Sequence, residues 1–339
     1  MQNPKIFTDH KIESSIKQGD YCSALKLLLT EQIKNWPQLS EVYSSLINVK
    51  TRSFRINKFK MKVQYNPSRF KSTSAKTDAV SIKSRECFLC IKNLPAEQLG
   101  INYHDKFIFL CNPFPIFPEH FTISSFGHQP QRLKLHFEEF LGLTKAVSHH
   151  YSIIYNGPHC GASAPDHLHF QAGTKNFLPT EHDIHQLKNA MGKIIYEDDK
   201  LVLTAINDAI RKIILIESSD EKVLTDSFNK FYDVYKSFDI STDEPMFNLI
   251  SYYDDGAGWT IIVFLRSRHR PERYFREDNQ KLLVSPAAVD LGGVLITPRE
   301  KDFDSMNEEI ISKIFEEVSL EKSTFLALYE KLKIVFNNN

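Results

Sequence analysis

The chain has 339 residues, 42% of them hydrophobic, which suffices for two globular domains or one fold built from two halves and excludes a disordered protein. Lys plus Arg and Asp plus Glu number 42 each, and this zero net charge gives no reason to expect nucleic acid or an anionic membrane as a partner. No segment approaches the roughly 18 apolar residues of a membrane span, and five cysteines without an apolar amino-terminal segment behind basic residues predict a protein of the reducing cytoplasm.

The first fifty residues show helical periodicity. Apolar residues recur at helical spacing from Cys22 to Ile47, and the pattern breaks at Trp36-Pro37. We therefore expect two helices that form a packing extension over residues 1–50. The segment 68–86 is polar and basic and predicts an exposed or ligand-ordered loop.

A cycle of strands and a helix follows. Apolar, β-prone runs and one helical pattern predict strands over 106–111, 121–124 and 151–155 and a helix over 133–149. The last strand leads into a turn-rich loop of small residues, 156–165.

A second cycle with the same element order then appears. The patterns predict strands over 201–206, 213–216, 246–253 and 260–265 and a helix over 223–238. Asp254–Gly258 is a hairpin signal between the last two strands. Ser305 and Glu308 form a capping box, which predicts the start of the carboxy-terminal helix.

The most informative motif lies between the two cycles. His167, His169 and Gln171 alternate along the chain, and in a strand this spacing brings polar side chains to one face. One imidazole could attack a target that its neighbours hold. The small side chains of the preceding loop let backbone N–H groups approach an anion. A His-x-His pair alone is also compatible with an ordinary strand.

This stretch resembles the nucleotidyltransferase branch of the histidine-triad superfamily, in which His-x-His-x-Gln follows an Asn-rich or Gly-rich loop. The branch includes galactose-1-phosphate uridylyltransferase, diadenosine tetraphosphate phosphorylases and GDP-hexose phosphorylases. His-Leu-His-Phe-Gln-Ala at 167–172 is most similar to the GDP-L-galactose and GDP-glucose phosphorylases. Supporting similarities occur at 64–69, 87–90, 112–120, 285–293 and 301–303, so the resemblance runs from about residue 60 to about residue 305.

The resemblance implies an α+β fold of tandem histidine-triad-like halves, each an antiparallel sheet packed with helices. It divides the chain into a helical extension at 1–50, a catalytic half at 51–190 and a half without the nucleophile at 191–339. A homodimer is left open.

The resemblance also implies roles for single residues. Imidazole has an unperturbed pKa of about 6.5, so it is largely unprotonated near neutral pH and can attack phosphorus. His169 matches the family's nucleophile, and Gln171 is expected to donate to a phosphate oxygen. Asn156, Gly161 and Ser163 would hold the other oxygens, although the uridylyltransferases place their serine where Ala164 stands here.

Cys87 and Cys90 form a Cys-x-x-Cys hook, and zinc in a structural site takes four ligands in a tetrahedron. The resemblance to uridylyltransferases that keep zinc implies that His167 and His128 complete the set, with His120 as the alternative to His128. Such a zinc ion would be structural. The other interpretation is a pair of buried thiols, because the GDP-hexose phosphorylases lack the hook.

Substrate phosphates also need cations. Arg69 and Lys76 lie in the polar amino-terminal loop. Arg266 and Arg268 alternate after the last predicted strand, in a segment similar to one that the uridylyltransferases use near the sugar phosphate. For each of these residues a solvated basic turn is the competing interpretation.

We therefore expect a nucleotidyltransferase of the GDP-hexose phosphorylase type that acts on a nucleotide sugar and phosphate, through a covalent nucleotidyl-histidine in a ping-pong sequence. Hexose-1-phosphate uridylyltransferase, with a sugar phosphate as second substrate, and dinucleoside polyphosphate phosphorylase are alternatives. A nucleotide-binding regulatory protein without turnover is the non-enzymatic alternative.

Overall fold

A ten-stranded antiparallel sheet forms the centre of the computed structural model, which describes residues 5–75, 78–239 and 242–338. Its strands, in spatial order, are β3 (Gly100–Tyr103), β4 (Phe107–Cys111), β5 (His120–Ser125), β7 (His169–Thr174), β6 (Tyr151–Asn156), β11 (Phe247–Asp254), β12 (Gly258–Leu265), β10 (Lys212–Ser218), β9 (Leu201–Asn207) and β8 (Gly192–Glu197). Every neighbouring pair is antiparallel.

The strand order repeats within this sheet. Strands β3, β4, β5, β7 and β6 run from one edge to the centre, and β8, β9, β10, β12 and β11 run in the same sequential pattern from the other edge. The helix α6 (Phe137–Ala146) follows β5, as α8 (Glu221–Lys236) follows β10. The predicted α+β fold is confirmed, and the two sets of strands join through β6 and β11. This repeat supports our proposal that residues 51–190 and 191–339 form tandem halves.

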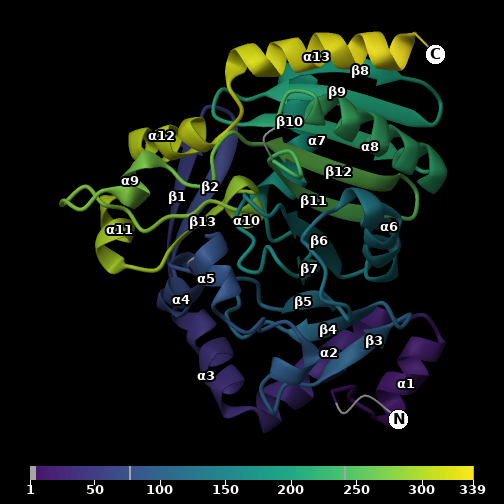
Figure 1. Cartoon of the computed structure of the whole chain (residues 1–339), viewed down its shortest axis with the longest axis vertical. Coiled ribbons are helices and arrows are strands. Elements are labelled where there is room, and N and C mark those ends of the chain that lie inside the picture. Colours follow the sequence, from purple (N-terminus) through teal and green to yellow (C-terminus); the bar gives the residue numbers. More distant parts are fainter. Residues whose placement is uncertain (1–4, 76–77, 240–241, 339) are drawn as a thin grey trace.

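A small second sheet connects distant parts of the chain. The hairpin of β1 (Lys50–Ile56) and β2 (Phe59–Tyr65) pairs with β13 (Val294–Thr297), which runs parallel to β2. This sheet protrudes beside the large sheet in Figure 1. It brings the amino-terminal segment up to the carboxy-terminal segment that follows β12.

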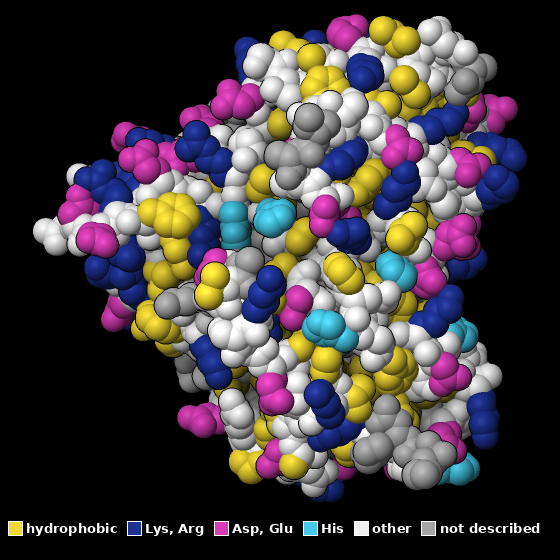
Figure 2. Space-filling model, in the orientation of Figure 1, with side chains coloured by type: hydrophobic (Ala, Val, Ile, Leu, Met, Phe, Trp, Pro, Cys, Tyr) yellow, Lys and Arg dark blue, Asp and Glu magenta, His cyan; other side chains and the backbone are white. Residues whose placement is uncertain are grey.

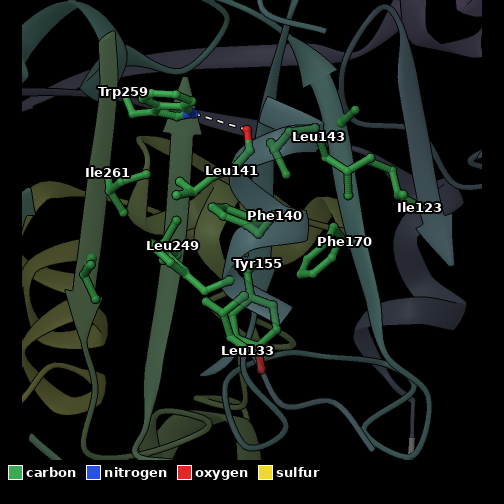
Figure 3. Close-up of a cluster of buried hydrophobic side chains, with 14 of the residues drawn as sticks. Ile123, Leu133, Phe140, Leu141, Leu143, Tyr155, Phe170, Leu249, Trp259 and Ile261 are labelled. Carbon is green, nitrogen blue, oxygen red and sulfur yellow. Dashed lines mark hydrogen bonds between the residues drawn. The ribbon is translucent and has the colours of Figure 1, made fainter. Parts of the chain in front are cut away.

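One face of the large sheet is covered by α2 (Tyr21–Asn35), α6, α8 and α13 (Lys322–Asn337) around the larger hydrophobic core. In Figure 3, Phe140 and Leu141 of α6 pack against Phe170 of β7 and Leu249 of β11. The indole Nε1–H of Trp259 donates to the carbonyl oxygen of Leu141 at 3.1 Å, which fixes α6 to the second half.

The opposite face carries a second core. In its second half this face is covered by the small sheet, α7 (Pro179–Met191), α10 (Ala288–Leu291) and α12 (Glu308–Val318). Because side chains alternate along a strand, the residues of β7 that flank Phe170 point to this second face. The cavity described below lies there, over the first half.

The amino-terminal extension has three helices rather than the predicted two, and they lie at the lower end of Figure 1. The break at Pro37 is confirmed, because α3 (Pro37–Ser45) begins there. The additional helix α1 (His10–Lys17) buries Ile12 and packs Ile16 against the larger core, and two apolar residues in eight are too short a pattern to predict a helix. Short helices complete the chain: α4 (Phe70–Thr73), α5 (Ala79–Lys83), α9 (Glu272–Phe275), α11 (Glu300–Ser305) and the 3-10 turns Leu46–Asn48, Pro67–Arg69, Ile91–Asn93 and Lys134–His136.

The predicted capping box was wrong. Ser305 is the last residue of α11, and α12 is capped by Asn307, whose side chain accepts a hydrogen bond from the backbone N–H of Ile310 at 2.9 Å. An asparagine oxygen satisfies the same free amides as a serine hydroxyl, so the start of the helix shifts to the residue that follows it.

Among the described residues, no helix combines the length and apolar character that a membrane crossing requires. On the face shown in Figure 2, Lys and Arg side chains are interspersed with Asp and Glu. This mixture agrees with the zero net charge of the chain.

Candidate active site

A cavity of about 670 Å³ lies on the second face of the large sheet and draws its walls from both halves of the chain. From the first half it is lined by His169, Gln171, Asn156 and the loop segment 161–163. From the second half it is lined by His269, Arg270, Ser285, Ala287 and Asp290. Most of the residues predicted to bind substrate therefore meet in one space.

His169 is the first residue of β7 and is 4% exposed. Its Nδ1 lies 2.8 Å from the carbonyl oxygen of His167, and because a carbonyl only accepts, Nδ1 carries the proton. The other nitrogen, Nε2, is left with its lone pair. Burial lowers the pKa of His169 to about 4, so the ring is neutral near pH 7. A buried, neutral imidazole with a free Nε2 is a competent nucleophile.

Gln131 connects the end of β6 to the start of β7. Its side-chain oxygen accepts from the backbone N–H of His169 at 2.8 Å, and its Nε2 donates to the carbonyl oxygens of Asn156 and His169 at 2.9 Å each. Sequence reasoning missed Gln131, because a single glutamine outside a motif gives no signal of such a role.

His120 orients the amide of Gln171. The ring Nδ1 of His120 accepts from the backbone N–H of Ile116 at 3.1 Å, so the proton lies on Nε2, which donates to Oε1 of Gln171 at 3.0 Å. The Nε2 of Gln171, with its two hydrogens, is thus left for the cavity. His120 therefore supports the catalytic strand and is not the alternative metal ligand.

Asn156 is oriented in the same way. Its Oδ1 accepts from Nδ2 of Asn248 at 2.7 Å and from the backbone N–H of Ala288 at 2.9 Å, which leaves its own amide hydrogens for the cavity. The adjacent loop is closely packed: Gly161 has φ +94°, and a Cβ there would lie 2.7 Å from Cβ of Ala287. Only glycine fits this position. Cys160 behind it is no nucleophile, since burial raises the pKa of its thiol to about 12.

The structure does not support the prediction that Arg266 and Arg268 bind phosphate. Arg266 is 1% exposed, and its guanidinium donates to Asn248 Oδ1 and to four carbonyl oxygens, those of Val318, Pro286, Arg268 and His269. All five of its N–H groups are therefore used within the protein. Arg268 is exposed, and neither residue lines the cavity. The strand ends at Leu265, so the alternation on which the prediction depended stops before them.

Arg69, Arg85 and Arg270 line the cavity with guanidinium groups that keep unused donors, and Arg85 is paired with Asp166. Arg69 donates from Nη1 to the carbonyl oxygen of Phe114 at 2.7 Å, and its buried Nε has no hydrogen-bond partner in the described chain. Arg270 donates to Ser285 Oγ and to the carbonyl oxygen of Ala75, both at 3.0 Å. Lys76, also predicted to bind substrate, lies outside the described residues.

Cys87, Cys90, His128 and His167 form a cluster whose ligand atoms all lie within 4.8 Å of one another. Cys87 Sγ is 3.2 Å and Cys90 Sγ is 3.6 Å from Nδ1 of His167, and Cys90 Sγ is 3.3 Å from Nδ1 of His128. Tetrahedral zinc with bonds of 2.0 to 2.3 Å places its ligand atoms roughly 3.5 Å apart. His167 points its Nε2 to the carbonyl oxygen of Ser125 at 2.9 Å, so its Nδ1 is the nitrogen available to a metal. The two thiols and two imidazoles therefore fit a tetrahedral metal ion.

Arg85 connects this cluster to the catalytic loop. Its guanidinium donates to Asp166 Oδ1 at 2.9 Å and to the carbonyl oxygen of Ser163 at 3.4 Å, and it lies over the ring of Phe88 at 4.9 Å. The segment that carries the thiols and the loop that lines the cavity are thus held together beside the site.

The buried histidines predict a pH dependence of stability. Burial lowers the pKa of His120 to about 3 and, together with Arg270, Arg266 and His159, that of His269 to about 3. Unfolded histidine, with a pKa of about 6.5, binds more protons in the window between these values, so the free energy of unfolding falls as pH drops below about 6.5. Each residue contributes about 1.4 kcal/mol per pH unit. Urea unfolding gives the free energy of unfolding at each pH. Between pH 6.5 and 5 this free energy should fall less steeply with pH in His269→Leu than in wild type, and an equally steep fall would contradict this assignment.

Two family models match the chain, one before α7 and one after it. A domain of unknown function, DUF4922, matches residues 28–174, and the GDPGP1-like C-terminal domain matches residues 193–338. Galactose-1-phosphate uridylyltransferase of Staphylococcus carnosus (strain TM300) is 26% identical over 164 residues, which are 47% of this chain and 30% of that protein. The match thus spans less than a third of the length of this relative.

The fold is similar to that of yeast Ap4A phosphorylase Apa2. The structure of Apa2 with Ap4A aligns with a TM-score of 0.59 at 15% identity, over 87% of this chain and 97% of the other. The structure with AMP aligns with a TM-score of 0.55 at 15% identity, over 86% and 96%. In fold the chain resembles Apa2, and over 164 residues its sequence resembles galactose-1-phosphate uridylyltransferase, so the chain is similar to nucleotidyltransferases of the histidine-triad superfamily, while its residues 193–338 match the GDPGP1-like C-terminal domain.

Proposed function

We propose that the protein is a nucleotidyltransferase that cleaves a nucleoside-diphosphate hexose with phosphate, through a nucleotide bound covalently to His169. The observation that carries this proposal is the state of His169 itself. It is neutral and buried, its Nδ1–H is held by the carbonyl of His167, and it lines a cavity of about 670 Å³ beside two amide donors.

In the first step, Nε2 of His169 forms a bond to the α-phosphorus, and the bond from that phosphorus to the bridging oxygen breaks, releasing hexose 1-phosphate. Nδ1 keeps its proton, so the nucleotidyl-imidazole carries a positive charge that the carbonyl oxygen of His167 stabilises. In the second step an oxygen of phosphate attacks the same phosphorus, the phosphorus–nitrogen bond breaks, and the nucleoside diphosphate leaves. No general base is needed, because the attacking nitrogen is already unprotonated.

The amides of Gln171 and Asn156 would hold the non-bridging oxygens of the α-phosphate, with Gly161 and Ser163 contributing from the loop. Charge develops on these oxygens in the transition state, and removal of one such donor typically costs roughly 10²–10³ in rate. We expect Gln171→Ala to slow both half-reactions by this amount in stopped-flow measurements. Gln171→Glu keeps the shape but loses the N–H donors, so it should be at least as slow, whereas a rate near wild type would contradict the role.

Arg69 and Arg270 are proposed to bind the phosphates, in place of Arg266 and Arg268. A charge-assisted hydrogen bond contributes about 1.5–3 kcal/mol, so Arg270→Ala should raise the apparent KM for phosphate roughly 10- to 100-fold. Arg268→Ala is the matched control, because this exposed side chain does not line the cavity, and it should leave KM unchanged. Equal effects of both substitutions would overturn the assignment.

Zinc is the metal that best suits Cys87, Cys90, His128 and His167, since two thiolates and two imidazoles form a closed tetrahedral site. When bound, it would supply structural cohesion rather than chemistry. The metal would hold the segment of Cys87 and Cys90 against the start of the catalytic strand. None of the five cysteines, all of them within the described residues, is in a disulfide, which supports the proposal of a reducing compartment such as the cytoplasm.

A GDP-hexose is the substrate we propose first, and the GDPGP1-like match of the carboxy-terminal domain supports it. The names of the other relatives suggest two competitors, a hexose-1-phosphate uridylyl transfer and a phosphorolysis of Ap4A. Incubation with GDP-glucose and phosphate, with UDP-glucose and galactose 1-phosphate, or with Ap4A and phosphate, followed by chromatography of the products, separates the three. Release of GDP and hexose 1-phosphate is expected, and the absence of turnover on all three would overturn the proposed reaction.

A further inference from the structure

Asn248 lies at the boundary between the two halves, in β11 of the second half. It is paired with Asn156 in β6 of the first half and with Phe264 in β12. The side chain of Asn248 is fully buried and does not line the cavity, whereas that of Asn156 does. The half without the nucleophile therefore places a buried amide next to one of the groups proposed to hold the α-phosphate.

Arg266 fixes the direction of this amide. A guanidinium group carries donors and no acceptor, so the Asn248 atom that meets Nη1 of Arg266 must be the oxygen, Oδ1. Nδ2 of Asn248 then points to the first half, where its two hydrogens are bound by Oδ1 of Asn156 at 2.7 Å and by the carbonyl oxygen of Cys160 at 2.6 Å. We call this chain of hydrogen bonds, from Arg266 through Asn248 to Asn156, the amide relay.

The amide relay determines which end of the Asn156 amide faces the cavity. Oδ1 of Asn156 accepts from Nδ2 of Asn248 and from the backbone N–H of Ala288 at 2.9 Å, and no described residue accepts from its Nδ2. Turning this amide over would leave two buried donors facing a nitrogen, which costs free energy because neither could be satisfied by water. It would also direct an oxygen, which repels the oxygens of a phosphate, into the cavity.

We propose that Asn248 and Arg266 are positioning residues for nucleotidyl transfer, which hold the amide of Asn156 with its N–H donors toward the α-phosphate. This inference rests on the proposed function and deepens it. It gives the second half, which lacks the nucleophile, a part in the reaction beyond that of a cavity wall. It also accounts for the burial of Arg266, whose other donors hold the carbonyl oxygens of Pro286 and His269, in two segments that line the cavity.

Asn248→Asp reverses the relay without changing its shape. The aspartate keeps an oxygen for Arg266, but its second oxygen replaces a donor and meets Oδ1 of Asn156 and the carbonyl oxygen of Cys160. Asn156 then turns or is displaced, and in either case its donor is lost to the phosphate, so kcat should fall roughly 10²- to 10³-fold. Asn307→Asp is the matched control, because Asn307 caps α12 outside the cavity and aspartate caps a helix equally well, so its kcat should match wild type.

Asn248→Ala removes the relay without adding a charge. The backbone N–H of Ala288 still donates to Asn156, so kcat should fall only about tenfold, less than in Asn248→Asp. A role in packing alone predicts the reverse order, because alanine leaves a cavity and aspartate does not. Steady-state kinetics of both variants, with thermal melting to show that they are folded, decide between the two orders. A folded Asn248→Asp that is as fast as Asn248→Ala would overturn the inference.

Sulfur substitution gives a readout that a packing defect does not change, and Asn248→Ala suffices for it if Asn248→Asp does not fold. The substrates are the two diastereomers of the nucleotide sugar in which sulfur replaces one non-bridging oxygen of the α-phosphate. Sulfur accepts hydrogen bonds weakly, so it slows the wild type at an oxygen that an N–H group binds. Asn156→Ala should lose this slowing for the diastereomer whose sulfur replaces the oxygen that Asn156 binds, and the Asn248 variants should reduce it for the same diastereomer.

A packing defect would instead lower all rates together and leave the ratios of oxygen to sulfur rates as in wild type. Ratios unchanged in Asn156→Ala, or in every folded Asn248 variant, would overturn the inference while the proposed reaction stands. A wild type that turns over no nucleotide sugar would overturn the proposed reaction itself, and this inference with it.

Discussion

Turnover of His169→Ala is expected to fall by roughly 10⁴- to 10⁶-fold, because loss of a nucleophile removes the whole covalent pathway rather than one stabilising contact. The measurement is steady-state release of hexose 1-phosphate from the preferred nucleotide sugar. The fold should persist, since the imidazole makes a single hydrogen bond, to the carbonyl of His167.

The control is His182→Ala. His182 is an exposed histidine of α7 whose ring contacts the carbonyl oxygen of Asn176 at 2.9 Å, outside the cavity, so its activity should match wild type. Circular dichroism and thermal melting of both variants distinguish lost chemistry from lost structure. Near wild-type turnover of folded His169→Ala would exclude His169 as the nucleophile.

The second large effect is expected from the metal cluster. Purified protein should contain close to one zinc per chain, and Cys87→Ser should lose it, because a hydroxyl is a poor zinc ligand and three remaining ligands bind far more weakly. Metal binding is coupled to folding, so the variant should melt at a clearly lower temperature than zinc-loaded wild type, and a chelator should lower the wild-type melting temperature in the same way.

Cys22→Ser is the matched control for this substitution. Cys22 is a buried thiol outside the cluster, where it donates to the carbonyl oxygen of Val147 at 3.3 Å, a bond that serine can keep. It should retain zinc. Metal-free wild-type protein whose melting does not change in Cys87→Ser would mean that Cys87 and Cys90 are simply buried thiols.

The sequence predicted those parts of the fold whose pattern is local. The hairpin of β11 and β12 was predictable because its strands are apolar and its turn has the residues that tight turns need. The strand β1 was not predicted, because its side chains are mostly exposed and show no apolar face. The strand β13 has only four residues and pairs with β2 from the opposite end of the chain, a contact that no local pattern specifies.

The same holds for the site, where residues of a local motif were predicted and residues that act through contacts between distant segments were not. The motif and the resemblance predicted His169, Gln171 and Asn156, which the structure brings together around the cavity. They could not predict Gln131, or that His120 orients the amide of Gln171. Both residues act through hydrogen bonds to the backbone or to another side chain across strands. Alternation suggested Arg266 and Arg268, but the end of β12 turns the chain, so that Arg270 reaches the cavity instead.

Intact-protein mass spectrometry of wild type mixed with the nucleotide sugar in the absence of phosphate tests the central claim most directly. We predict a mass increase of one nucleoside monophosphate per chain. The adduct should be labile in acid and stable in base, as expected of a phosphorus–nitrogen bond to imidazole, and it should disappear on addition of phosphate and be absent from His169→Ala. Turnover with no adduct on wild type under any quenching condition, or an adduct that persists in His169→Ala, would contradict the account.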